Sequence, residues 1–147
     1  MFKYNLFLFK DLPSAWLCGV RVRVLNDKKC IITVKHNWFN SNPFKSLYWA
    51  VQGMASELAT GLAIIDFANK NSLNISMLVV SNESRFLKKA KGKIRFECDE
   101  VSKIKKTLSS LSKNKTTDKI KLKSTGYDES GDVVSEFIYE WSFKLKL

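Results

Sequence analysis

One carboxylate stands alone in a long apolar stretch of this sequence. Glu57 is the only charged residue between Lys45 and Asp66. Burial without a partner is strongly unfavourable for a charged carboxylate, so its presence calls for a reason. In a catalytic interpretation, burial raises the pKa of the Glu57 carboxyl group, which then activates water or attacks an electrophilic carbon. In the structural alternative, Glu57 hydrogen-bonds a backbone group or a partner chain and does no chemistry.

Two polar side chains precede Glu57 at positions that suit binding of a carbonyl oxygen. Asn42 and Ser46 lie in an asparagine-rich segment, 37–45, and at the start of the apolar stretch that follows it. Free backbone amides of a helix N-terminus at 46–49 would polarise a carbonyl oxygen, and either side chain could add a donor. The alternative roles are a turn for Asn42 and a helix N-cap for Ser46.

A buried helix over 46–68 is predicted to carry these groups. The segment is apolar nearly all round and rich in good helix formers. Ala50, Gly53, Glu57 and Gly61 share one face at helical spacing, and small residues there allow close approach to the backbone. The segment is long enough to span a membrane, but its polar residues and the strand patterns on both sides favour a core helix.

Strand patterns surround this helix. Alternating apolar residues predict strands at 20–24, 30–34, 94–98, 120–122 and 137–145. The apolar run at 75–80 is typical of a strand that is buried on both faces. A short helix is expected at 2–10 and an amphipathic one at 101–111. The pattern predicts an α+β domain over residues 1–147, with a curved antiparallel sheet of about six strands wrapped around one long central helix.

Composition excludes several classes of protein. The chain has a net charge of +11, but only four of its 25 basic residues are arginines, which argues against direct base readout, and no motif for stacking nucleic-acid bases is present. A lysine-rich solvated surface is the simpler explanation. The three cysteines and single histidine, His36, predict neither a metal site nor a disulfide framework, and no cofactor is expected. The cytosol is the expected location.

The element order and four spaced residues resemble hotdog domains of the thioesterase-like superfamily. The chain is similar to an uncharacterised family of that group, which is related to acyl-CoA thioesterases. The residues are Asn42, Ser46, Tyr48 and Glu57, the last of them fifteen positions after the first. The segment from Arg85 to Lys88, followed by Gly92, is similar to the strand and turn that such domains place near coenzyme A phosphates. The resemblance runs from about residue 13 to the end of the chain.

The resemblance implies a thioesterase acting on acyl-CoA or acyl carrier protein, as a homodimer or dimer of dimers with sites between subunits. Glu57, Asn42 and Ser46 are then the catalytic candidates. The substrate-binding candidates are Trp49, Ala50, Gly53, Arg85, Lys88 and Lys89. Many active relatives carry His-Gly-Gly at the mouth of the helix, whereas this chain has no histidine there and Trp49 replaces a glycine, which would narrow or block the site. The alternative function is therefore a non-catalytic hotdog domain that binds an acyl or other apolar ligand.

Overall fold

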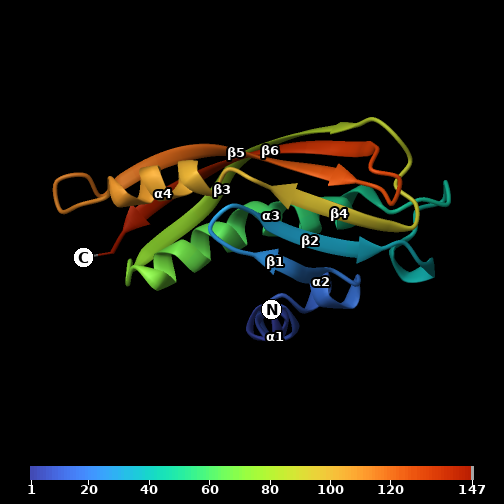
Figure 1. The fold of residues 1–147 in the computed structure, drawn as a ribbon, viewed down its shortest axis with the longest axis horizontal. Coiled ribbons are helices and arrows are strands. Elements are labelled where there is room, and N and C mark those ends of the chain that lie inside the picture. Colours follow the sequence, from blue (N-terminus) through green and yellow to red (C-terminus); the bar gives the residue numbers. More distant parts are fainter. Residues whose placement is uncertain (147) are drawn as a thin grey trace.

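A single antiparallel sheet lies over one long helix in the computed structural model, which describes residues 1–146 (Figure 1). The sheet contains six strands in the order β1-β2-β4-β5-β6-β3. They are β1 (Arg21–Leu25), β2 (Cys30–Lys35), β3 (Ile75–Phe86), β4 (Lys93–Cys98), β5 (Thr117–Tyr127) and β6 (Val133–Leu145). Every neighbouring pair is antiparallel. The predicted α+β architecture is confirmed.

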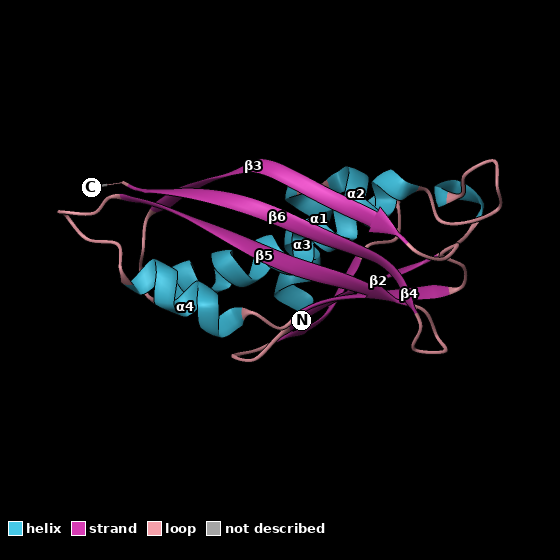
Figure 2. Ribbon diagram, turned by 90° about the horizontal axis from the view of Figure 1, so that it is seen from above, coloured by secondary structure: helices cyan, strands magenta, loops and turns pink. Residues whose placement is uncertain are grey.

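The long helix α3 (Trp49–Lys70) packs against β2, β4, β5 and β6. Figure 2 shows it beneath the long strands β5, β6 and β3. Most of its buried side chains are apolar, and they meet a core in which Phe96, Phe137 and Phe143 are almost fully covered. The buried polar side chains of Gln52, Ser56 and Thr60 form hydrogen bonds to β6. Alternation along β6 places one aromatic side in this core, as the sequence pattern predicts.

Three shorter helices and one turn of 3-10 helix complete the chain. α4 (Val101–Ser109) is amphipathic and packs its apolar side on α3 and β5. α1 (Phe2–Asp11) and α2 (Pro13–Leu17) lie beside β1. η1 (Trp38–Asn40) interrupts the asparagine-rich segment after β2 and is capped by the Asn37 side chain.

The start of α3 differs from the predicted one. The helix begins at Trp49 and its N-cap is Tyr48, so Ser46 is not the N-cap. The Ser46 amide and hydroxyl instead donate to the Asn42 side-chain oxygen, at 3.2 Å each. Serine and asparagine bind nearby backbone groups readily, and here that local bonding holds 42–46 as a loop before the helix can start.

The segment beginning at Ile75 was expected to be buried on both faces, and this expectation is wrong. β3 is an edge strand in which partly buried and exposed side chains alternate. Leu78 is 64% exposed and Val80 is 41% exposed. Within residues 1–146, β6 is the only strand that pairs with β3, so the other edge of β3 and its outward side chains are uncovered in this part of the chain.

Candidate active site

A cavity of about 360 Å³ opens where α3 begins. The 42–46 loop forms one wall and the β3–β4 connection forms the other. A backbone hydrogen bond of 2.8 Å from Leu47 to Ala90 holds the two walls together. The residues that line the cavity are Asn42, Phe44, Ser46, Leu47, Trp49, Gln52, Phe86, Leu87, Lys88, Lys89 and Ala90.

Five of the nine predicted site residues line this one cavity, namely Asn42, Ser46, Trp49, Lys88 and Lys89. The Asn42 side chain is fixed by three bonds to its oxygen, from Phe44, the Ser46 amide and the Ser46 hydroxyl. Trp49 forms one wall and is 56% exposed, so its indole is available to a ligand that enters from outside. The apolar rings and the polar loop suit a molecule with an apolar part and a hydrogen-bonding part.

Gln52 also lines this cavity, although it was not among the predicted site residues. The side chain is buried, its amide nitrogen donates to the carbonyl oxygen of Leu47 at 3.2 Å, and its oxygen accepts from the Ser135 hydroxyl at 2.8 Å. These bonds connect the first turn of α3 to β6 and fix the inner wall of the cavity. A glutamine in an apolar helix was the signal that could have identified it.

Glu57 lies on a different side of α3. The helix turns about 100° per residue, so Glu57 and Gln52 are about 140° apart around its axis. Glu57 does not line the cavity. Its carboxylate is near Gly61, where an added Cβ would be 3.7 Å from one carboxylate oxygen. Burial alone raises the pKa of the Glu57 carboxyl group. Burial also raises the pKa of the neighbouring Tyr139 phenol, and the Glu57 charge adds a smaller increase.

The face of α3 that carries Glu57 is only partly covered. Ala50 and Gly53 are half-buried there, and a Cβ added to Gly53 would meet no atom within 4 Å. At Gly61, by contrast, the Trp141 indole approaches to 3.0 Å from such a Cβ, so the absence of a side chain lets β6 pack closely. The small-residue face therefore has an open end at Gly53 and a closed end at Gly61.

Hydroxyl groups beside Glu57 are bonded to one another and to the helix. The Ser56 and Tyr139 oxygens are 2.6 Å apart. The Trp141 indole donates to the Thr60 hydroxyl at 3.0 Å, and Thr60 in turn donates to the backbone oxygen of Glu57. This network holds the turn of α3 around Glu57, while none of these bonds uses its carboxylate. A half-buried carboxylate of raised pKa, whose oxygens take part in none of the hydrogen bonds found within residues 1–146, can accept a proton or attack an electrophilic carbon.

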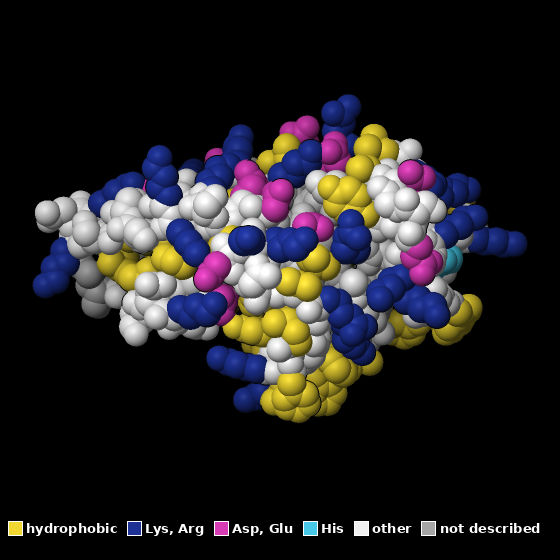
Figure 3. Space-filling view, in the orientation of Figure 1, with side chains coloured by type: hydrophobic (Ala, Val, Ile, Leu, Met, Phe, Trp, Pro, Cys, Tyr) yellow, Lys and Arg dark blue, Asp and Glu magenta, His cyan; other side chains and the backbone are white. Residues whose placement is uncertain are grey.

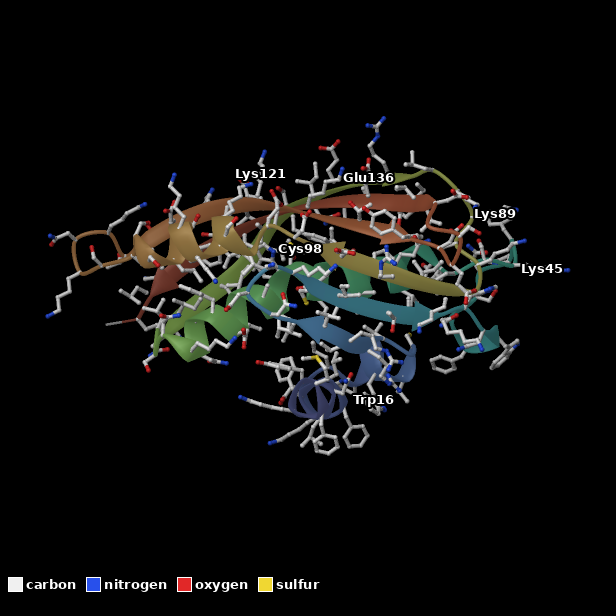
Figure 4. All side chains as sticks on the ribbon, in the orientation of Figure 1. Trp16, Lys45, Lys89, Cys98, Lys121 and Glu136 are labelled. Atoms are coloured by element: carbon white, nitrogen blue, oxygen red, sulfur yellow. The ribbon has the colours of Figure 1, made fainter. Side chains whose placement is uncertain are left out.

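The three basic residues predicted for substrate binding have different surroundings. Lys88 and Lys89 line the cavity, whereas Arg85 does not. Lys88 forms ion pairs with Asp128 at 2.6 Å and Asp132 at 2.7 Å, and these bonds raise the pKa of its amine. Lys89 lines the cavity and lies at the same end of the molecule as Lys45 (Figure 4). Arg85 is on the outer face of β3, in a separate hollow with Glu83, Lys123 and Glu136, and does not line the cavity.

His36 lies outside the cavity, and its ring nitrogen is 2.9 Å from the Ser41 hydroxyl. Within residues 1–146, no group of three or more histidine, cysteine, aspartate or glutamate side chains lies close enough together to hold a metal ion. None of the helices of this described part is long and apolar enough to cross a membrane.

Comparison with solved structures identifies the architecture. A Pseudomonas aeruginosa protein of unknown function, named a probable thioesterase, superposes with a TM-score of 0.81 at 20% identity, covering 99% of this chain and 97% of that one. The chain has the hotdog fold. A Chlorobaculum tepidum protein of unknown function shares this hotdog fold with a TM-score of 0.84 at 14% identity, covering 98% and 93% of the two chains.

A Staphylococcus aureus protein called a thioesterase enzyme also shares the hotdog fold. Its TM-score is 0.70 at 11% identity, covering 90% of this chain and 98% of that one. It was solved as a glutamine-to-alanine variant and also as a glutamate-to-alanine variant, with the two substituted positions fifteen residues apart. Comparison of the sequence with protein-family models and with curated proteins finds no match.

Proposed function

We propose that this hotdog protein hydrolyses acyl thioesters carried by coenzyme A or acyl carrier protein, with Glu57 as general base or nucleophile. The observation that carries the proposal is the Glu57 carboxylate, which lies half-buried on an open helix face with its pKa raised by burial. Such a group is basic enough to take a proton from water, and within the described residues no hydrogen bond or ion pair occupies its oxygens.

The spacing in the Staphylococcus aureus thioesterase supports the choice of residues. The two positions substituted in that protein are fifteen residues apart, as Asn42 and Glu57 are here. In this chain Asn42 and Ser46 would orient the thioester carbonyl, and the first amides of α3 would stabilise the developing negative charge on its oxygen. Trp49 and the small residues Ala50 and Gly53 would flank the acyl chain.

A dimer would bring the separated parts together. In one chain the cavity and Glu57 lie on different sides of α3, and both the Glu57 face and the β3 edge are partly uncovered. A second copy placed along β3 would cover the Glu57 face and the β3 edge. The cavity of each subunit would then face Glu57 of the other subunit. Lys89 would then meet the phosphates of coenzyme A or the acidic surface of a carrier protein. We also place the protein in the cytosol, where its cysteines would stay reduced.

The test is single-turnover hydrolysis of a panel of acyl-CoA and acyl carrier protein thioesters. Glu57→Gln keeps the shape and removes the proton acceptor, so hydrolysis is expected to fall by about two to four orders of magnitude. Glu140→Gln, on the outer face of β6, is the matched control and is expected to hydrolyse normally. Unchanged hydrolysis by Glu57→Gln would overturn the catalytic role.

A second candidate function is binding of an acyl or other apolar ligand without hydrolysis. The specific observation in its favour is that Glu57 does not line the cavity of a single chain. In that case the wild-type protein binds acyl-CoA but hydrolyses no member of the panel, and Glu57→Gln binds as tightly as the wild type.

A further inference from the structure

An apolar surface on α1 and α2, outside the candidate active site, is exposed to solvent. We call it the aromatic face, and it consists of Phe2, Leu6, Phe9, Trp16 and Leu17. Phe2 is 83% exposed and Phe9 is 58% exposed. Phe2, Leu6 and Phe9 follow one another at i, i+4 and i+7, so they share one side of the helix. Figure 3 shows apolar side chains gathered over this part of the molecule.

The aromatic face is hollowed as well as apolar. Phe2, Asn5, Leu6, Phe9 and Trp16 line a depression of about 300 Å³ whose lining is almost entirely hydrocarbon. Phe9 and Trp16 pack edge to face with ring centroids 5.5 Å apart, and Figure 4 shows Trp16 beside α1. Soluble surfaces rarely leave contiguous aromatic groups in water, so this face calls for an occupant.

The opposite side of α1 is firmly attached to the domain. The Asn5 side chain donates to the Val22 carbonyl at 3.0 Å and accepts from the Val22 amide at 2.9 Å. The Tyr4 hydroxyl donates to Asp66, and Leu8 is fully buried. The helix is therefore held in a fixed orientation against the β1 edge, and the aromatic face points outward because the other face is already used.

Positive charge borders the aromatic face. Lys3 and Lys10 are seven residues apart and lie on one flank of α1, while Arg21 stacks over the Trp16 ring at 3.5 Å and Arg23 is exposed beyond it. Against these four basic residues, Asp11 is the only acid between positions 1 and 23. Figure 3 shows lysine and arginine side chains on both sides of the apolar group.

We propose that α1 and α2 dock this protein onto an anionic membrane surface, with the aromatic face inserted among the headgroups. Ten helical residues reach about 15 Å, too short to cross a bilayer, so α1 would lie in the plane of the interface. Aromatic and leucine side chains favour that depth, and lysines on the flank reach the phosphates. The net charge of +11 adds long-range attraction to acidic lipid. The basic border of the aromatic face would repel the same face of a second copy, so lipid is the favoured occupant of this surface.

The experiment is co-sedimentation of the full chain with vesicles of phosphatidylcholine alone or mixed with phosphatidylglycerol. The wild type is expected to bind the acidic vesicles and not the neutral ones, and binding should weaken as salt is raised. Phe2→Ser combined with Phe9→Ser is expected to weaken binding on the order of tenfold or more. Lys3→Glu combined with Lys10→Glu should abolish the preference for acidic lipid.

The matched control removes two equally exposed aromatic rings elsewhere, with Trp38→Ser and Phe39→Ser on η1. Trp38 is 91% exposed and Phe39 is 58% exposed. This control is expected to bind acidic vesicles as the wild type does, and circular dichroism checks the fold of every variant. The proposal is overturned if the wild type does not bind acidic vesicles, or if the control variant loses as much binding as the Phe2 and Phe9 variant. It is also overturned if the Phe2 and Phe9 changes leave vesicle binding unchanged and instead convert a dimer to a monomer. Thioester hydrolysis is not a readout, so failure of the proposed function leaves this test intact.

Discussion

The phenol oxygen of Tyr139 lies 2.6 Å from the hydroxyl oxygen of Ser56. The same phenol donates to the backbone oxygen of Gly53 at 3.1 Å. These bonds fasten β6 to the turn of α3 that precedes Glu57, and they do so without using the carboxylate. The position of Glu57 is thus set by its neighbours, which leaves its own oxygens available.

Tyr139→Phe is therefore expected to destabilise the domain. The substitution removes one buried hydroxyl and leaves Ser56 with a single acceptor, so the free energy of unfolding should fall by about 1–2 kcal/mol. Urea unfolding measures the change. Tyr127→Phe is the control, since the Tyr127 hydroxyl makes none of the hydrogen bonds found within residues 1–146, and it should unfold as the wild type does. Equal losses in both variants would contradict the role of the Ser56 contact.

Glu57 should make stability depend on pH in a direction set by its raised pKa. The folded state holds the Glu57 proton more tightly than the unfolded state, so its stabilising contribution is complete below the ordinary pKa of glutamate. That contribution is lost as pH rises through the raised pKa of the folded protein. Glu57→Gln removes the titration. Its unfolding free energy relative to the wild type should therefore increase with pH in this window.

Urea unfolding of the wild type and Glu57→Gln, between about pH 4 and pH 8, measures this difference. Asp118 and Asp128 have lowered pKa values because of their lysine partners, and they change stability in the opposite sense at lower pH. Both proteins contain these groups, so the comparison cancels them. A difference that stays constant with pH would mean that Glu57 titrates alike in the folded and unfolded chains.

Lys88 and Lys89 are adjacent in sequence, but the structure predicts different effects on coenzyme A binding. Both lysines line the cavity, but Lys88 is already paired with Asp128 and Asp132, whereas Lys89 is in none of the ion pairs found within residues 1–146. Lys89→Ala should weaken coenzyme A binding by about fivefold at low salt, and less as salt is raised. Affinity for a thioester without phosphates should be unchanged. Lys88→Ala is the neighbouring control, and calorimetry measures the affinity of both variants. Equal losses of affinity would mean that the two lysines act only as general surface charge.

Patterns in the sequence predicted the elements better than their surroundings. Apolar periodicity located α3 and all six strands, because burial against one core imposes that periodicity. The predicted segments at 75–80 and 120–122 were too short, since β3 continues to Phe86 and β5 spans Thr117–Tyr127. The start of α3 was missed by three residues because the Asn42 side chain binds Ser46 locally, and such competition leaves no periodic signal. The apolar run from Ile75 predicted a strand, but its composition does not distinguish the centre of a sheet from an edge.

The candidate site was predicted only in part, for a geometric reason. Spacing along the chain placed Asn42, Ser46 and Trp49 near one helix end, and they do share a cavity. Arg85 and Lys88 are three residues apart in the sequence, yet Arg85 lies on the outer face of β3, since successive strand residues point to opposite sides. Gln52 stands out in the sequence as a polar residue in an apolar helix, but its place in the cavity wall follows only from the structure.

The last prediction concerns the open edge of β3. Leu78 points outward from this strand and is 64% exposed. If two copies pair along β3, Leu78→Lys adds a positive charge to each of the paired edge strands, and the two charges repel each other. Sedimentation velocity is expected to show a dimer for the wild type and a monomer for Leu78→Lys. Hydrolysis should fall together with dimer content if each site spans two subunits.

Leu17→Lys, on α2, is the matched control for this experiment, because Leu17 is 66% exposed and lies away from β3. It adds the same charge at an equally exposed leucine, so it should leave the mass of the dimer unchanged. A monomer produced by Leu17→Lys instead of Leu78→Lys would locate the contact between copies on the aromatic face, and it would contradict both the β3 interface and the membrane surface proposed for α1 and α2. A monomeric wild type that hydrolyses thioesters would show that one chain holds a complete site.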